Sequence, residues 1–228
     1  MSVPAALSGL QVFYGGTFDP VHNGHIAIAE SAAAALHTRV WLMPAADPPH
    51  RAPPGADADQ RARMLQLAVA GRPQLQVDLR ELERARRRPG VPSWTVDTLR
   101  ELRQQLGPRQ PIALLMGADS LLGLPAWHEW EALTALAHIV VAERPGSALD
   151  GVLPPLLEQH LHAAWVGAPS ALAMSPAGRV WRMQQPLHTE SATAVRELIG
   201  GHGDWRALLP AAVADYIQVQ GLYGCQRP

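Results

Sequence analysis

Short apolar runs alternate with stretches of helical periodicity along most of this chain. Residues 112–116 form a nearly all-apolar run, which is typical of a strand buried on both faces of a parallel sheet. Residues 23–36 instead repeat apolar side chains at helical spacing. This alternation predicts an α/β fold, a Rossmann-like doubly wound parallel sheet with helices on both faces. Folds of this kind bind ligands beyond the carboxyl ends of their strands, so residues that follow strands are the first site candidates.

The pattern also predicts where the elements lie. The expected strands are 10–14, 39–43, 75–79, 112–116, 139–142 and 180–183. The expected helices are 23–36, 59–70, 93–106 with Ser93 as N-cap, 133–138, 191–199 and 211–220. Residues 83–91 are expected to form a basic turn, and no clear element is assigned to 145–178. We expect one domain over 1–228, with a small C-terminal helical part from about residue 186.

Composition restricts the function further. Apolar residues make up 47% of the 228 residues and charged residues 17%, which is enough apolar surface for a buried core. The net charge of −1 argues against a general binder of nucleic acid or of membrane surfaces. All 19 basic side chains are arginine, and the lack of lysine excludes a Walker-type P-loop and Schiff-base catalysis. The lone Cys225 excludes an intramolecular disulfide and a cysteine-rich zinc site.

The sequence also bears on location. Residues 1–9 lack the basic start of a signal peptide. No apolar run reaches the roughly 18–20 residues that a membrane helix needs. We therefore expect a soluble cytoplasmic protein with no membrane partner.

The segment that follows the first expected strand reads GGTFDPVHNGH over residues 15–25. Gly15 and Gly16 let the backbone turn tightly and approach a ligand without a Cβ clash. The next helix then begins near His22, and its unpaired N–H groups and positive dipole end favour an anion. His22 and His25 are three residues apart, so both lie on one side of the first turn. The segment predicts a phosphate site, since no carboxylate stands beside the histidines at the spacing of a zinc protease.

A second cluster of phosphate-binding residue types opens a late helix. Ser191 and Thr193 offer hydroxyl groups, and Arg196 offers a guanidinium that binds phosphate oxygens in pairs. Alone, this pattern also fits an N-cap serine followed by a surface arginine.

Together, these segments resemble the GGTFDPxHxGH and SxTxxR motifs of the HxGH nucleotidyltransferases. Over almost the whole chain, the sequence is similar to the bacterial nicotinate mononucleotide adenylyltransferases. The resemblance implies adenylyl transfer from ATP to nicotinate mononucleotide by direct in-line attack, with Mg²⁺ as the cofactor that accompanies ATP. It implies His22, His25 and Arg196 as catalytic residues. The implied ATP and phosphate contacts are Gly15, Gly16, Thr17, Phe18, Gly24, Ser191 and Thr193.

The same resemblance implies a site for the mononucleotide. The backbone N–H groups of Trp94 and Thr95 would bind the nicotinate carboxylate, and Trp127 would stack on the pyridine ring unless it is only a core aromatic. Asp119 either accepts hydrogen bonds from ribose hydroxyls or caps the next short helix. His50 either touches phosphate or faces solvent. No protein ligand for a metal is assigned: Asp19 either binds the ion or is structural, and the structural role is the one expected.

Several alternatives stay open from the sequence. The phosphate acceptor could be nicotinamide mononucleotide or phosphopantetheine, because the histidine motif handles only the shared ATP chemistry. A catalytically silent nucleotide sensor is a further alternative. The arginines 84 and 86–88 are expected to lie on a solvated loop with no nucleic-acid partner. Residues 44–54 are a candidate lid, and the oligomeric state is undecided.

Overall fold

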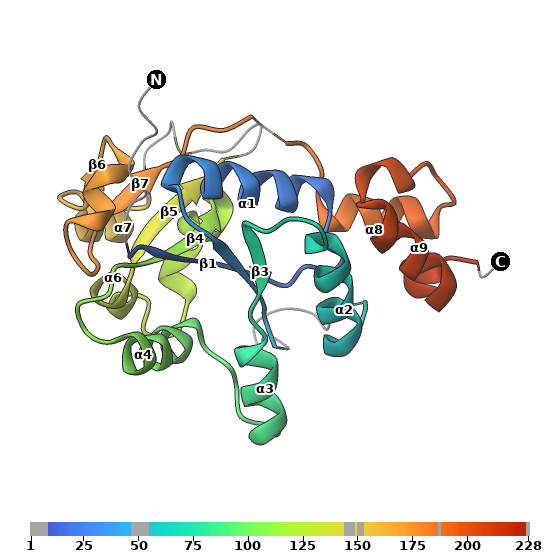
Figure 1. Cartoon of the computed structure of the whole chain (residues 1–228), viewed down its shortest axis with the longest axis horizontal. Coiled ribbons are helices and arrows are strands. Elements are labelled where there is room, and N and C mark those ends of the chain that lie inside the picture. The colour runs from blue at the N-terminus through green and yellow to red at the C-terminus, as the bar shows by residue number, and fades with distance from the viewer. Residues whose placement is uncertain (1–8, 47–54, 144–148, 150–152, 187, 227–228) are drawn as a thin grey trace.

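The structure is a computed structural model that describes residues 9–46, 55–143, 149, 153–186 and 188–226. The described residues contain a seven-stranded sheet with the order β3-β2-β1-β4-β5-β7-β6, and all adjacent strands in it are parallel (Figure 1). The strands are β1 Gln11–Gly16, β2 Val40–Pro44, β3 Leu75–Val77, β4 Ile112–Gly117, β5 His138–Ala142, β6 Trp165–Val166 and β7 Val180–Arg182. The predicted α/β fold with a doubly wound parallel sheet is confirmed.

Helices connect the strands and cover both faces of the sheet. They are α1 Asn23–Leu36, α2 Ala58–Val69, α3 Arg80–Arg87, α4 Thr95–Leu106, α5 Ala118–Leu122, α6 Ala132–Leu136, α7 Pro155–Leu161, α8 Ala192–Gly200 and α9 Ala211–Gln220. Short 3-10 segments occur at Leu124–Ala126, Pro169–Ala173, Arg206–Leu208 and Leu222–Gly224. In the described part of the chain, no helix has the length and apolarity needed to cross a bilayer.

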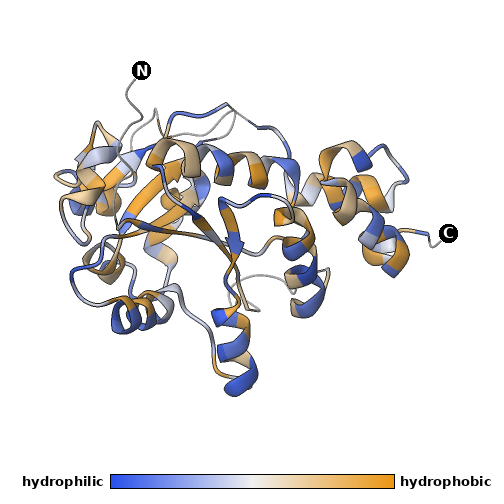
Figure 2. Cartoon of the chain, in the orientation of Figure 1, coloured by the Kyte–Doolittle hydropathy of each residue, from blue (hydrophilic) through white to orange (hydrophobic). Residues whose placement is uncertain are grey.

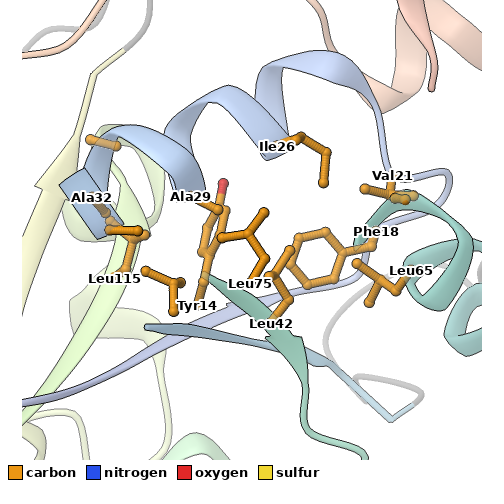
Figure 3. Close-up of a cluster of buried hydrophobic side chains, with 14 of the residues drawn as sticks. Tyr14, Phe18, Val21, Ile26, Ala29, Ala32, Leu42, Leu65, Leu75 and Leu115 are labelled. Atoms are coloured by element: carbon orange, nitrogen blue, oxygen red, sulfur yellow. The ribbon is translucent and has the colours of Figure 1, made fainter. Parts of the chain in front are cut away.

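Two buried clusters lie on the two faces of the sheet. Along β1, Val12 and Tyr14 belong to one cluster and Phe13 to the other, as the alternation of side chains in a strand requires. Figure 3 shows the first cluster in the space between α1 and the sheet, where Tyr14 points toward Ala29. Hydrophobic residues concentrate on the strands, whereas much of α3 is hydrophilic (Figure 2). Burial of the two faces therefore fixes the position of β1, the strand that leads into the histidine segment.

The C-terminal helices pack on the same cluster as β1. Val195 of α8 and Val213 and Ile217 of α9 are buried in it. Helix α9 contacts α2, and Figure 1 shows α8 and α9 beside the end of α1 and α2. This packing brings α8, with Arg196, to the segment that follows β1.

The structure corrects the prediction for residues 83–91. Only residues 88–91 form a turn, because Arg80–Arg87 is helix α3. Arg84 is also not on a solvated loop: its side chain is 15% exposed, and its guanidinium pairs with Glu101 and donates to Ser93 Oγ. Ser93 is therefore not the N-cap of the next helix, which begins at Thr95 with Trp94 as N-cap. Residues 155–173, which had no assignment, contain α7, β6 and a 3-10 segment.

His138 is a buried histidine whose neutral form the fold requires. Its Nδ1 accepts a hydrogen bond from the Arg179 N–H at 3.0 Å, and its Nε2 lies 2.9 Å from the Ser175 carbonyl oxygen. Burial lowers the pKa of His138. As pH falls below about 6.5, His138 therefore becomes protonated in the unfolded chain while it is still neutral in the native state.

Neutral His138 stabilises the native state above the pKa of the unfolded chain, about 6.5. We expect this stabilisation to be lost as pH falls from there through the lower native pKa. The measurement is the thermal midpoint at about pH 7.5 and about pH 5 for the wild type and for His138→Leu. The variant should be less stable at the higher pH and should lose less stability on acidification. His162→Leu, at an exposed histidine, serves as the control. An identical pH dependence of wild type and His138→Leu would contradict the assignment.

Candidate functional site

Two adjoining cavities lie at the carboxyl ends of the central strands. The sheet continues from β1 to β2 on one side and to β4 on the other, which is the position at which doubly wound folds bind ligands. The larger cavity has a volume of about 560 Å³ and the smaller about 120 Å³. Gly15, Gly16 and Thr17, at the end of β1, and Ser120, after β4, line both. A ligand that spans the two cavities would therefore pass over the Gly-Gly turn.

His22 and His25 line the larger cavity at the start of α1. His22 is the N-cap, and its Nδ1 accepts a hydrogen bond from the His25 N–H at 3.4 Å. In return, His25 Nδ1 accepts one from the His22 N–H at 3.3 Å, which makes a capping box built from two imidazoles. The rings stack with centroids 3.7 Å apart. Because each Nδ1 is an acceptor, each neutral ring carries its proton on Nε2, and both rings are hydrogen-bond donors at Nε2.

The glycines of this segment allow the close packing around the histidines. A Cβ on Gly16 would lie 2.9 Å from the Phe18 ring, which in turn packs edge-on against the His25 ring at 5.0 Å. A Cβ on Gly24 would lie 3.1 Å from His22 Nδ1 and 3.3 Å from a carboxylate oxygen of Glu190. A side chain at either position would push the imidazoles out of place, so the spacing of the motif has a steric reason.

Asp19 ties the histidine segment to two distant parts of the chain. Its carboxylate accepts hydrogen bonds from the N–H groups of Gly55 and Ala56, at 2.8 and 3.1 Å, and from the Tyr223 hydroxyl at 2.7 Å. Burial and the charge of Asp19 raise the pKa of Tyr223, so the phenol stays a donor. The expectation that Asp19 is structural agrees with these contacts.

Arg196 reaches the larger cavity from α8, and the fold holds its guanidinium in place. One Nη donates to the Asp19 carbonyl oxygen at 2.6 Å, and the other lies 3.3 Å from the Thr193 hydroxyl. Ser191, the N-cap of α8, and Thr193 line the same cavity. The structure thus brings the two sequence motifs together across 177 residues of chain.

Arg61 is a buried cation beneath these loops that the sequence did not single out. It is 0% exposed and donates to the carbonyl oxygens of Thr17 and Ala45, at 2.9 and 2.7 Å. These oxygens follow β1 and β2, so Arg61 links the segment after β1, which lines both cavities, to the segment after β2, which lines the smaller one. Nothing in the local sequence distinguishes Arg61 from its neighbour Arg63.

The smaller cavity is lined by aromatic residues. Trp94 and Thr95, at the start of α4, face it together with Trp127 and His128. Trp94 and His128 stack with ring centroids 4.9 Å apart. The N–H of Thr95 belongs to the first turn of α4, where helical N–H groups lack partners within the helix. Trp94, Thr95 and Trp127, which the resemblance places around a nicotinate ring, therefore lie at one cavity. His128 lines the same cavity and was not predicted.

The remaining predicted residues lie as follows. Asp119 lines the larger cavity and is the second residue of α5, whose N-cap is Gly117, so the N-cap alternative for Asp119 is wrong. His50 lies outside the described residues, as does most of the candidate lid over 44–54. Glu143, His188 and Glu190 line the larger cavity without having been predicted. Among the described residues, no group of three or more His, Cys, Asp or Glu side chains could hold a metal ion.

Comparison with known proteins gives consistent similarities. A family model described as cytidylyltransferase-like matches residues 13–198. The chain is 58% identical over 222 residues to a probable nicotinate-nucleotide adenylyltransferase of Stenotrophomonas maltophilia (strain K279a), with 97% of this chain and 100% of that relative covered. It is 48% identical to a protein of the same name from Xylella fastidiosa (strain M12), with 96% and 98% covered.

A solved structure shares the fold. The Plasmodium falciparum nicotinic acid mononucleotide adenylyltransferase complexed with NaAD matches with a TM-score of 0.70 at 15% identity. The match covers 95% of this chain and 98% of that one. At this identity the likeness bears on the fold alone.

Proposed function

The chain belongs to the cytidylyltransferase-like family and, within it, to the nicotinate-nucleotide adenylyltransferases, and from this premise we propose how its cavities divide the reaction. ATP occupies the larger cavity and nicotinate mononucleotide reaches into the smaller one. The 5′-phosphate of the mononucleotide attacks the α-phosphorus of ATP, which yields deamido-NAD and pyrophosphate. The observation that carries the proposal is the shared wall at Gly15–Thr17, where a donor-lined cavity and an aromatic cavity meet.

The roles of the side chains follow from their chemistry. His22 and His25 donate from Nε2 to the phosphate oxygens whose charge grows in the transition state. Arg196 holds the pyrophosphate side, together with the hydroxyl groups of Ser191 and Thr193. The attacking phosphate is already an anion, so no general base is needed, and catalysis is positioning with charge stabilisation.

Nucleotidyltransferases that use ATP generally act with a divalent metal, and we propose that Mg²⁺ arrives here as the complex with ATP. Both carboxylate oxygens of Asp19 already accept hydrogen bonds from the protein. We therefore expect the ion to keep phosphate and water ligands. We further propose that the chain forms one domain over 1–228, since α8 and α9 share a buried cluster with β1. A cytoplasmic location is also part of the proposal.

The test is an assay of the purified protein with ATP and Mg²⁺, in which nicotinate mononucleotide and nicotinamide mononucleotide are offered side by side. Dinucleotide and pyrophosphate are both quantified. Formation of both products with a preference for the acid supports the proposal. Binding of ATP without product from either mononucleotide would overturn it. A screen with phosphopantetheine would then separate another acceptor from a silent nucleotide sensor.

We expect Trp127→Ala to raise the KM for nicotinate mononucleotide by about tenfold, the size of one lost aromatic stacking contact, with little effect on the KM for ATP. The measurement is steady-state kinetics with each substrate varied in turn. Trp130→Ala is the matched control, because Trp130 packs on the same hydrophobic cluster but does not line the cavity. Equal rises in both KM values for Trp127→Ala would show that Trp127 only packs.

A further inference from the structure

A buried acidic residue lies in the wall of the smaller cavity. Glu81, on α3, is 8% exposed and lines this cavity together with Trp94 and Thr95. An ionised carboxylate at this place works against a ligand that itself carries a carboxylate. The cavity proposed to receive nicotinate therefore has in its wall a carboxylate that disfavours binding of the acid form of the ligand.

The surroundings of Glu81 show how this charge is offset. Its Oε1 accepts a hydrogen bond from the Thr98 hydroxyl at 2.7 Å, and a guanidinium nitrogen of Arg84 lies 4.0 Å away. Arg84 also donates to Thr98 Oγ1 at 2.5 Å and to Ser93 Oγ at 2.7 Å, and it pairs with Glu101 at 3.0 Å. Burial raises the pKa of Glu81, and the Thr98 hydrogen bond and the Arg84 charge offset only part of that rise. Ser93 and Thr98 flank Trp94 and Thr95, so this network borders the segment expected to bind the ring substituent.

We propose that the balance of charge between Glu81 and Arg84 sets how strongly the smaller cavity prefers the acid over the amide form of the pyridine mononucleotide. The inference rests on the proposed function and concerns the specificity of that same site. It assigns Glu81 and Arg84 as specificity-determining residues, whereas the resemblance assigns only Trp94, Thr95 and Trp127 to the ring.

The physical argument starts from the likeness of the two ligands. Nicotinate and nicotinamide have nearly the same shape, and each offers an oxygen that can accept a hydrogen bond from the Thr95 N–H. They differ by one unit of charge, so the electrostatic field of the cavity discriminates between them. Glu81 disfavours the acid, and Arg84 favours it. The Glu81 side chain is 11% exposed and the Arg84 side chain 15%. Both are shielded from solvent, so water and salt screen their charges little.

The experiment measures kcat/KM for nicotinate mononucleotide and for nicotinamide mononucleotide under identical conditions and takes their ratio. Glu81→Gln keeps the shape of the side chain and removes its charge, and we expect the acid-to-amide ratio to rise by about tenfold. Arg84→Gln should lower the ratio by about tenfold. Calorimetric titration with each mononucleotide provides a second readout that does not depend on turnover.

The opposite signs distinguish a charge effect from packing. If Glu81 and Arg84 only stabilised the cavity wall as an ion pair, removing either side chain would weaken binding of both mononucleotides. The acid-to-amide ratio would then not move in opposite directions in the two variants. Arg84→Lys keeps the charge but loses the paired hydrogen bonds, so it should retain the acid preference even if its thermal midpoint falls. Glu101→Gln removes the other carboxylate that Arg84 binds. The Glu101 side chain is 27% exposed, so solvent screens its charge more than that of Glu81, and the ratio should change by less than about threefold.

Two results would overturn the inference. One is a ratio that stays within about threefold of the wild type in both Glu81→Gln and Arg84→Gln, well below the tenfold expected from one unscreened charge. The other is a shift of both variants in the same direction. A wild-type protein that uses neither mononucleotide would instead overturn the proposed function, so the two failures are told apart.

Discussion

Replacing His25 with alanine is expected to lower kcat by about 10²–10⁴-fold, the size of one lost transition-state donor, while the fold stays intact. The reason lies in the direction of the hydrogen bonds in the capping box. His25 Nδ1 accepts the His22 N–H, so the ring donates from Nε2. Alanine removes this donor and one cap, and the lost cap costs about 1 kcal/mol of stability. The measurements are pyrophosphate release at saturating substrates and the thermal midpoint.

The control is a histidine at the other end of the same helix. His37 is exposed and caps α1 in the left-handed conformation, with φ of 48°. Asparagine tolerates that conformation, so His37→Asn should leave kcat within about threefold of the wild type. Wild-type turnover in His25→Ala would contradict the role of His25, whatever the change in stability.

Local signals explain why much of the fold was predictable. Helix α1 has the predicted bounds, Asn23–Leu36, because a turn precedes it and apolar residues repeat at helical spacing along it. Helix α3 was missed for the opposite reason. Its sequence is rich in arginine, and Arg84 is held by Glu101 and Thr98, which lie in another helix. Such contacts depend on the tertiary fold and leave no mark in a local pattern.

The same distinction applies to the candidate site. His22, His25 and Arg196 stand in motifs, and the structure brings all three to one cavity. Arg61 and Glu81 are buried beside the two cavities but lie among other charged residues in the sequence, where exposure cannot be judged. The sequence therefore identified the groups expected to touch ligands, whereas the charges that support the cavities required coordinates. The roles of the motif residues stay predictions until they are tested.

Replacing Arg196 with alanine is expected to lower kcat/KM for ATP by about 10²–10³-fold, because a charge-assisted donor to the pyrophosphate side is lost. Arg196→Lys should restore only part of the loss, since lysine lacks the planar pair of donors. Tyr223→Phe is the matched control: Tyr223 and Arg196 both contact Asp19, but the phenol does not line the larger cavity. Steady-state kinetics with ATP varied distinguishes the two cases. If Tyr223→Phe lost as much activity as Arg196→Ala, Arg196 would act by holding Asp19 in place and not by binding phosphate.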